Sequence, residues 1–351
     1  MDSPKISVLV PMYNRKHYIE QCLDSVFNQT FQDFEIIVRD DGSTDGSAEF
    51  VEKLYAPAIS SGKLKLQRNE KNLGEFPTDN RLLREAAGKY IMILHSDDLY
   101  LPNALQHLYE VAEKFNVDVV NGCKYLISAP DGVIVKGTPL KRINNGNHQV
   151  DKVEVISDKP LARFNEWNTG GTGIDAQHNI FSRKFLADND LRFEVFGGNR
   201  LFALEWFMKA KIFVKTPTLF YIYRNAPDSS SNYKFPPERI KKFISEQIEL
   251  SRYLDKFFAR EDFFKDKPEL QYLARSHLLF VHDNWRINRL GIYKDGITPE
   301  LHRAVEEAFK KNFGDDAAFT TFLFHWIHAM QSDNRVTAII PPRNVFILKA
   351  A

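Results

Sequence analysis

Short apolar runs alternate with amphipathic segments along the first 125 residues. Five runs rich in apolar and β-branched residues predict strands, at 6–10, 34–38, 64–66, 90–94 and 117–120. Between them, apolar residues recur at helical spacing, which predicts helices at 19–27, 48–54, 81–87 and 102–115. This alternation predicts an α/β fold with a mostly parallel sheet and helices on both faces. The run at 90–94 is the most apolar, so we expect it near the centre of the sheet.

The pattern changes after residue 125. Residues 126–160 are rich in Gly, Asn, Lys and Pro without a clear period, and we interpret them as a loop or hairpin insertion. Further along we expect a glycine-rich loop at 168–173, a strand or short helix at 180–186, a helix at 201–210 and a strand at 213–223.

A second change follows the polar stretch at 227–231. Apolar stripes predict about four helices beyond it, at 240–254, 270–288, 304–313 and 317–330. We therefore expect a first domain at 1–225, with halves at 1–125 and 126–225, followed by a C-terminal helical region at 226–351.

Composition excludes several classes of protein. Lys and Arg number 47 against 46 Asp and Glu, so the chain lacks the basic excess typical of nucleic-acid binders. Cys22 and Cys123 are too few for a disulfide framework, and we expect two small core residues in a reducing compartment. No apolar run approaches the roughly 18 residues of a membrane span, and 1–10 does not resemble a signal peptide. A cytoplasmic location is therefore the default expectation.

Three polar clusters follow predicted strands, at 11–15, 39–45 and 95–98. The carboxyl ends of parallel strands meet at one edge of the sheet, where ligands bind in such folds. The clusters hold five carboxylates, whose repulsion requires a cation or hydrogen-bond donors. Mg²⁺ or Mn²⁺ holding a diphosphate fits this need, because such ions take one or two carboxylates together with phosphate oxygens. We favour a functional role for Asp41 and Asp97, and a helix-start role for Asp45.

Common catalytic motifs are missing from the sequence. No GxGxxG follows the first strand, which disfavours a dinucleotide oxidoreductase, and no GxxxxGK[ST] is present. The sequence also lacks CxxC, HExxH and a nucleophile elbow, which argues against redox, zinc-protease and serine-hydrolase chemistry.

Several ordered motifs resemble the family 2 glycosyltransferases. They lie at 6–14, 38–47, 72–74, 80–88 and 90–102, in the family's usual order and spacing. The match covers about 5–125 well and thins towards 225. The resemblance implies the GT-A fold, a nucleotide-sugar donor, a divalent metal (Mn²⁺ or Mg²⁺) and inversion at the anomeric carbon. It makes 1–125 the nucleotide-binding half and 126–225 the acceptor half.

The resemblance also implies roles for individual residues. Asp41, with Asp40, would accept a bond from the base N3–H, which suits uracil and favours a UDP-sugar. Asp97 matches the last carboxylate of the DxD motif, the metal ligand that bridges to the diphosphate. The residues expected to line the nucleotide site are Pro11, Tyr13, Asn14, Asp40, Asp41, His95, Ser96 and Asp97.

The sequence departs from the family pattern at three places. His95 replaces the first carboxylate of the DxD motif; it either contacts a ribose hydroxyl or Mn²⁺ or is a strand-end residue without a ligand role. Asp79 stands where family members usually carry Arg. The acidic pair that usually supplies the base is replaced at 199–200, which leaves Glu205 and Asp175 as candidates for the general base.

These observations favour an inverting, metal-dependent glycosyltransferase that moves a sugar from a UDP-sugar to a glycan, lipid-linked or protein acceptor. The C-terminal helices are then expected to bind the acceptor, a second copy of the chain or the inner face of a membrane. One alternative is a nucleotidyltransferase, although 11–15 is not the glycine-rich loop that such an enzyme needs. The other is a non-catalytic member that binds only a nucleotide sugar or a partner protein.

Overall fold

The computed structural model describes residues 3–128, 134, 140–144, 150–168, 175–195, 198–226, 249–250 and 252–278. The chain forms two compact units, Met1–Pro227 and Asp228–Ala351. Among the described residues, no helix is long and apolar enough to cross a bilayer. Cys22 and Cys123 are buried and unpaired, as predicted.

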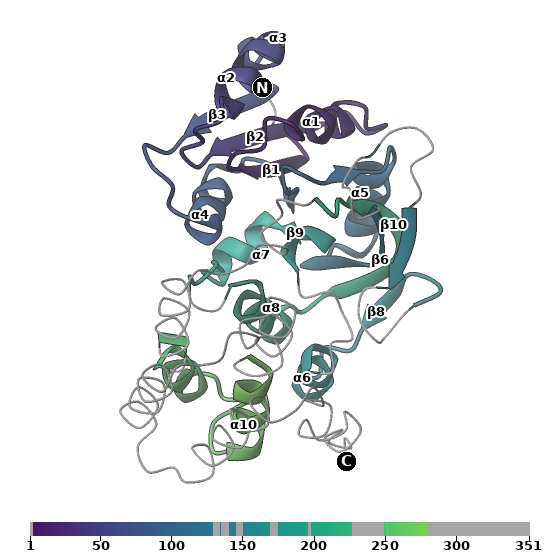
Figure 1. The fold of residues 1–351 in the computed structure, drawn as a ribbon. Coiled ribbons are helices and arrows are strands. Elements are labelled where there is room, and N and C mark those ends of the chain that lie inside the picture. Colours follow the sequence, from purple (N-terminus) through teal and green to yellow (C-terminus); the bar gives the residue numbers. More distant parts are fainter. Residues whose placement is uncertain are drawn as a thin grey trace, which may run out of the picture. The chain divides into compact units, whose positions relative to one another are not determined.

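Four parallel strands form the N-terminal half of the sheet, in the order β3-β2-β1-β4; Figure 1 labels the first three of them. Their bounds are β1 (Ile6–Met12), β2 (Phe34–Asp40), β3 (Leu64–Arg68) and β4 (Tyr90–Ile93). β1 lies between β2 and β4, and every residue of β2 and β4 is buried. Burial from both sides explains why these strands appear in the sequence as nearly continuous apolar runs.

The second half of the sheet is mixed. β9 runs antiparallel to both β4 and β6, and β10 runs parallel to β6. β4, β6 and β10 therefore point the same way, and their carboxyl ends share one edge with those of β1 and β2. The bounds are β5 (Leu99–Tyr100), β6 (Val119–Ser128), β7 (Leu140–Asn144), β8 (Glu154–Ile156), β9 (Asn179–Ser182) and β10 (Phe213–Tyr223).

Helices cover both faces of this sheet. The apolar sides of α1, α2 and α5 join one core cluster with alternate residues of β1 and β2. On the other face, α4 contacts β1 and β2, while Trp206 of α8 packs against Phe181 and Phe213. The bounds are α1 (Ile19–Phe27), α2 (Ser47–Leu54), α3 (Ala56–Ser60), α4 (Glu75–Glu85), α5 (Ala104–Phe115), α6 (Pro160–Asn168), η1 (Ala176–His178), α7 (Arg183–Asp188) and α8 (Gly198–Lys209). The predicted α/β architecture is confirmed.

The structure differs from the sequence-based expectation at several places, and α3, β5 and α6 correspond to no predicted element. The helix predicted at 81–87 begins earlier, at Glu75, because the backbone N–H groups of Leu73 and Gly74 are anchored by Asp41 before the helix starts. The segment at 126–160, expected to be a loop or a hairpin insertion, contains the end of β6 and two further strands, β7 and β8; β7 pairs antiparallel with β6, which agrees with the hairpin alternative. β8 has only three residues, two of them exposed, and such short edge strands carry little periodic signal.

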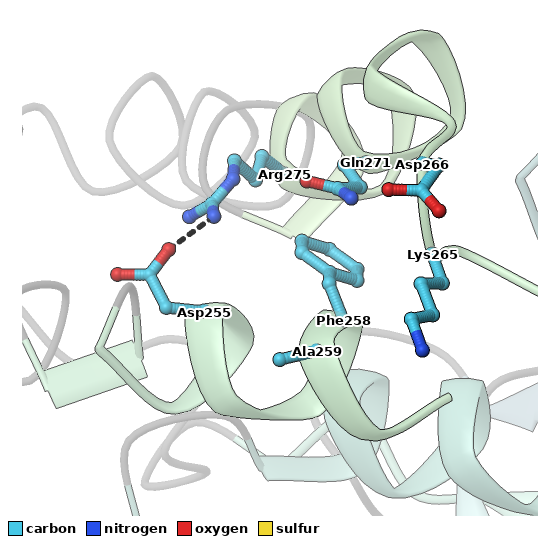
Figure 2. Close-up of a pocket in the computed structure, with 7 residues that line it drawn as sticks. All are labelled: Asp255, Phe258, Ala259, Lys265, Asp266, Gln271 and Arg275. Atoms are coloured by element: carbon cyan, nitrogen blue, oxygen red, sulfur yellow. Dashed lines mark hydrogen bonds and ion pairs between the residues drawn. The ribbon is translucent and has the colours of Figure 1, made fainter. Parts of the chain in front are cut away.

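The C-terminal unit is described over two helical segments, at 252–260 and at α10 (Pro268–Ser276). Phe257, Phe258 and Phe264 pack ring against ring between them. A cleft lies beside this cluster (Figure 2), and its lining residues are Asp255, Phe258, Ala259, Lys265, Asp266, Gln271 and Arg275. The predicted helices at 304–313 and 317–330 lie outside the described residues, as does much of 240–254 and 270–288.

Candidate active site

Two loops at the carboxyl edge of the sheet are tied together by Asn14. Asn14 has a left-handed backbone (φ 53°), and its N–H donates to the Ser43 hydroxyl at 2.9 Å. The Asn14 side-chain oxygen accepts the Thr44 N–H at 2.9 Å. These bonds join the β1–α1 loop to the β2–α2 loop. Pro11, near the end of β1, is half-buried. Tyr13 beside them is 42% exposed, so its ring is available to stack on a planar ligand.

Asp45 organises the start of α2 from the same loop. Its carboxylate accepts the N–H groups of Ser47 and Lys16 and the Ser47 hydroxyl. Burial opposes ionisation, but these hydrogen bonds prevail and lower the pKa of Asp45. The expected helix-start role of Asp45 is confirmed.

Asp41 is buried and heavily hydrogen-bonded. Its Oδ1 accepts Asn69 Nδ2 at 2.7 Å and the Leu73 N–H at 2.9 Å, and its Oδ2 accepts the Gly74 N–H at 2.8 Å. A carboxylate has about four acceptor positions, so these bonds leave about one for a ligand. The contact of Asp41 with a base stays a prediction, and the structure adds that Asp41 fixes the loop preceding α4.

Asp40 has one buried oxygen that accepts no hydrogen bond. Its Oδ2 accepts the Ser43 N–H at 3.1 Å, whereas its Oδ1 has no partner. An unsatisfied buried acceptor is costly. The nucleotide-binding role expected of Asp40 stays a prediction.

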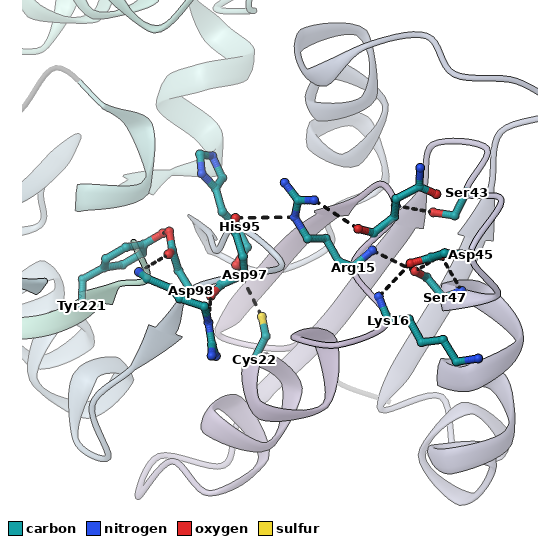
Figure 3. Close-up of polar contacts among 12 residues, drawn as sticks. Arg15, Lys16, Cys22, Ser43, Asp45, Ser47, His95, Asp97, Asp98 and Tyr221 are labelled. Carbon is teal, nitrogen blue, oxygen red and sulfur yellow. Dashed lines mark hydrogen bonds and ion pairs between the residues drawn. The ribbon is translucent and has the colours of Figure 1, made fainter. Parts of the chain in front are cut away.

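The turn after β4 carries His95, Ser96, Asp97 and Asp98 (Figure 3). Asp98 is buried, and its two oxygens accept the Tyr221 hydroxyl and the Arg224 N–H. Arg224 Nε also donates to the Asp97 carbonyl at 2.6 Å. Burial and then the nearby Asp97 charge raise the pKa of Asp98 to about 7. The end of β10 therefore holds the acidic turn in place.

Asp97 faces the β1–α1 loop. Its Oδ2 lies 3.5 Å from Arg15 Nε, and the side chains are 14% and 18% exposed. Ser96 is buried beside it. One accessible carboxylate suits a Mg²⁺ or Mn²⁺ ion that takes its other ligands from a diphosphate and water. No group of three His, Cys, Asp or Glu suited to a metal occurs within the described residues, so the diphosphate would have to complete the coordination.

His95 and Asp79 lie within a field of negative charge. His95 Nε2 is 3.8 Å from Glu75 Oε1. Burial acts to lower the pKa of His95, but the carboxylates of Glu75, Asp98 and Asp97 raise it overall. Asp79 is buried and its Oδ1 has no hydrogen-bond partner. Burial, followed by the charge of Glu75, raises the pKa of Asp79 well above its ordinary value.

The two candidates for the general base have different surroundings. Asp175 is half-buried immediately before η1, and its charge acts on His178 and Tyr125. His178 stacks on Tyr125 with ring centroids 4.8 Å apart and meets the Tyr221 ring edge-on. Burial lowers the pKa of His178 to about 4, so the ring is neutral at pH 7. Tyr221 bonds Asp98, so this aromatic group connects the surroundings of Asp175 to the acidic turn.

Glu205 lies on the second turn of α8 and is only 3% exposed, between Leu204 and Trp206. Residues that sequence reasoning missed are Arg15, Tyr221 and Arg224. Arg15 lies within the polar cluster at 11–15 that the sequence analysis identified. Tyr221 and Arg224 lie more than 120 residues along the chain from the turn that they hold.

Comparison with known proteins identifies the family. The model of the family described as "Glycosyl transferase family 2" matches residues 7–189, more than half of the chain. The chain therefore belongs to glycosyl transferase family 2. The expected resemblance is confirmed.

Curated relatives and solved structures support this assignment. Glycosyltransferase GlyG of Streptococcus pneumoniae is 35% identical over 37% of this chain and 42% of its own length. The poly(ribitol-phosphate) β-N-acetylglucosaminyltransferase TarP of Staphylococcus aureus is 28% identical over 65% of each chain. This chain thus spans 42–65% of the length of these two relatives.

Two solved structures share the fold. S. aureus TarS 1–349 in complex with UDP-GlcNAc matches with a TM-score of 0.63 at 21% identity, over 95% of this chain and 90% of that one. The mannosyltransferase PcManGT of Pyrobaculum calidifontis, in complex with GDP-Man and Mn²⁺, matches with a TM-score of 0.50 at 16% identity, over 96% and 83%. The GT-A-type fold expected from the sequence is confirmed.

Proposed function

We propose that this chain transfers a sugar, with inversion, from a UDP-sugar to a hydroxyl group of a glycan, lipid-linked or protein acceptor. The observation that carries the proposal is the accessible Asp97 carboxylate at the edge where the loops of Asn14 and Asp41 also meet. The UDP-GlcNAc bound by TarS and the name of TarP make UDP-GlcNAc and a polyol-phosphate polymer the first pair to test.

Each part of the donor would meet a different residue group. Tyr13 stacks on the base, because its ring is the exposed aromatic surface of the β1–α1 loop. Asp41, with Asp40, accepts a base N–H group, and its three internal hydrogen bonds leave about one acceptor position for it. Asp97 holds Mn²⁺ or Mg²⁺, which when bound neutralises the diphosphate that leaves. The Mn²⁺ bound with GDP-Man by PcManGT is consistent with this cofactor.

Asp175 is the better candidate for the general base. A base must reach the acceptor hydroxyl, and Asp175 is half-buried whereas Glu205 is 3% exposed. We expect Asp175→Asn to lower kcat by about 10²–10⁴-fold while UDP binding stays unchanged. Glu205→Gln is the matched comparison, since it removes the same charge from the other candidate. The reverse result, with kcat lost only in Glu205→Gln, assigns the base to Glu205.

The donor site is tested by titrating UDP into the full chain with and without Mn²⁺. We expect Asp97→Ala to remove the metal-dependent part of the affinity, and Glu52→Ala, which removes a well-exposed carboxylate, to leave it intact. UDP affinity in Mn²⁺ that is unaltered by Asp97→Ala contradicts the proposal. UDP binding without turnover of any donor sugar would instead make the chain a nucleotide-sugar-binding member without transferase activity.

The domain roles and partners predicted from the sequence are part of this proposal. Residues 1–225 bind donor and acceptor, and 226–351 contribute to binding of the acceptor, a second copy or a membrane surface. All candidate site residues lie within the unit Met1–Pro227.

A further inference from the structure

Arg15 is held at the centre of the candidate active site by its own loop and by the first residue of α2. Its backbone N–H donates to the Ser47 hydroxyl at 2.9 Å, which fixes the start of the side chain. Its Nη1 donates to the Asn14 carbonyl at 3.1 Å. The guanidinium therefore lies between the β1–α1 loop and the Asp97 carboxylate (Figure 3).

The ion pair between Arg15 and Asp97 is longer than a direct hydrogen bond. Arg15 Nε is 3.5 Å from Asp97 Oδ2, whereas charge-assisted hydrogen bonds between nitrogen and oxygen are about 2.7–2.9 Å long. Both side chains keep some exposure, at 18% and 14%. A long, partly solvated ion pair is weak, so a stronger charge can replace either partner at little cost.

A metal and a diphosphate would act on this pair in opposite directions. A divalent cation at Asp97 repels the guanidinium that now neutralises that carboxylate. A diphosphate presents several anionic oxygens, and the planar fork of a guanidinium matches them in a bidentate manner. Arg15 thus loses one partner and gains another within the same site.

We propose that Arg15 is a diphosphate-binding residue that exchanges its ion pair with Asp97 for phosphate oxygens of the donor. This inference rests on the proposed function. Before binding, Arg15 neutralises Asp97; afterwards, it contributes a positive charge to the diphosphate in addition to that of the metal. Arg15 and a metal ion therefore compete for Asp97 in the protein without donor.

Removing the charge of Arg15 tests the phosphate contact. We expect Arg15→Gln to weaken UDP binding by about 10- to 100-fold and to leave uridine binding unchanged, because uridine lacks the phosphates. Arg15→Lys should recover part of the loss, since the charge returns without the fork. Isothermal titration of the full chain with uridine, UMP and UDP measures these differences.

Lys16→Gln is the matched control. This substitution also removes one positive charge, at the next residue in the sequence. The Lys16 side chain is exposed and extends away from Asp97 (Figure 3). We expect its affinities for all three ligands to equal those of the wild type. Equal losses of uridine and UDP affinity in Arg15→Gln would mean that Arg15 only supports the loop, and an unchanged UDP affinity would overturn the phosphate contact.

A second measurement needs no nucleotide. Electron paramagnetic resonance of Mn²⁺ titrated into the full chain should report tighter Mn²⁺ binding in Arg15→Gln than in the wild type, because Asp97 is released from its competitor. Weaker or unchanged Mn²⁺ binding overturns the exchange. A wild-type chain that binds no uridine nucleotide contradicts the proposed function instead, and the Mn²⁺ result still decides whether Arg15 competes for Asp97.

Discussion

Two buried carboxylates near the candidate site have very different support. Asp98 receives the Tyr221 hydroxyl and the Arg224 N–H, so both of its oxygens are satisfied. Asp79 has a buried oxygen without a partner and lies near Glu75 and Asp41, whose charges add to its destabilisation. Burying an ionised carboxylate without donors costs free energy, and the group responds by holding its proton more tightly.

This difference predicts that Asp79→Asn stabilises the protein at high pH. The native pKa of Asp79 is raised, so the wild type loses stability as the pH rises from about 4, its ordinary pKa, to the native value. The amide has no charge to bury, and we expect it to increase the free energy of unfolding by about 1–3 kcal/mol at pH 8. The gain should vanish below pH 4, where the wild-type carboxyl is protonated in both states.

Urea unfolding at pH 4 and pH 8 provides the measurement. Asp190→Asn is the control, because it makes the same chemical change at a side chain that is 86% exposed. A gain from Asp79→Asn that is the same at both pH values would show that charge is not its cause.

At the residue scale, the sequence predicted those roles that depend on neighbours along the chain. Asp45 at the start of α2 is such a case, since its partners Ser47 and Lys16 are nearby in the sequence or in the adjoining loop. The support of Asp98 by Tyr221 was not predictable, because the register of β10 in the sheet decides which of its residues reaches the turn. Local periodicity contains no information on that register.

At the element scale, the pairing of β6 with β10 depends on a glycine. A Cβ added to Gly122 of β6 would lie 1.9 Å from the Phe220 ring of β10. Phe220 is fully buried and immediately precedes Tyr221, so its position also determines where Tyr221 meets Asp98. The strands at the centre of the sheet were predictable from their apolar runs, whereas a cross-strand contact of this kind was not.

We expect Gly122→Ala to lower the free energy of unfolding by about 1–3 kcal/mol, the usual cost of overpacking a core. Phe220→Leu in the same chain should recover part of that loss, because a smaller side chain makes room for the added methyl group. Urea unfolding of both single variants and the double variant gives the interaction energy. Strictly additive losses would mean that the ring and the methyl group do not meet.

At the scale of the whole molecule, the two units divide the chain at Pro227. The predicted boundary at 225 rests on the change in pattern after the polar stretch at 227–231, and the assignment of roles to each side is a proposal. Every candidate donor contact lies before that division, so donor binding should not depend on residues beyond it.

A fragment of residues 1–227 should therefore bind UDP with a Kd within about threefold of the full chain, a difference of about 0.7 kcal/mol. It should lose transfer to an acceptor if the second unit binds that acceptor. Circular dichroism establishes whether the fragment is folded, and calorimetry then compares the two affinities. A folded fragment that does not bind UDP would mean that the donor site needs the C-terminal unit.

The dependence of the acidic turn on Arg224 has a consequence for biosynthesis. Arg224 follows Asp97 by 127 residues, and ribosomes add about 5–20 residues per second, so roughly 6–25 s separate the two during translation. β1 to β4 can pair early in that interval. The acidic turn after β4 then still lacks the hydrogen bonds from Tyr221 and Arg224 that hold it in the complete chain. We expect the nascent chain to bind no donor until β10 and Arg224 have emerged, so that donor binding waits until the unit Met1–Pro227 is nearly complete.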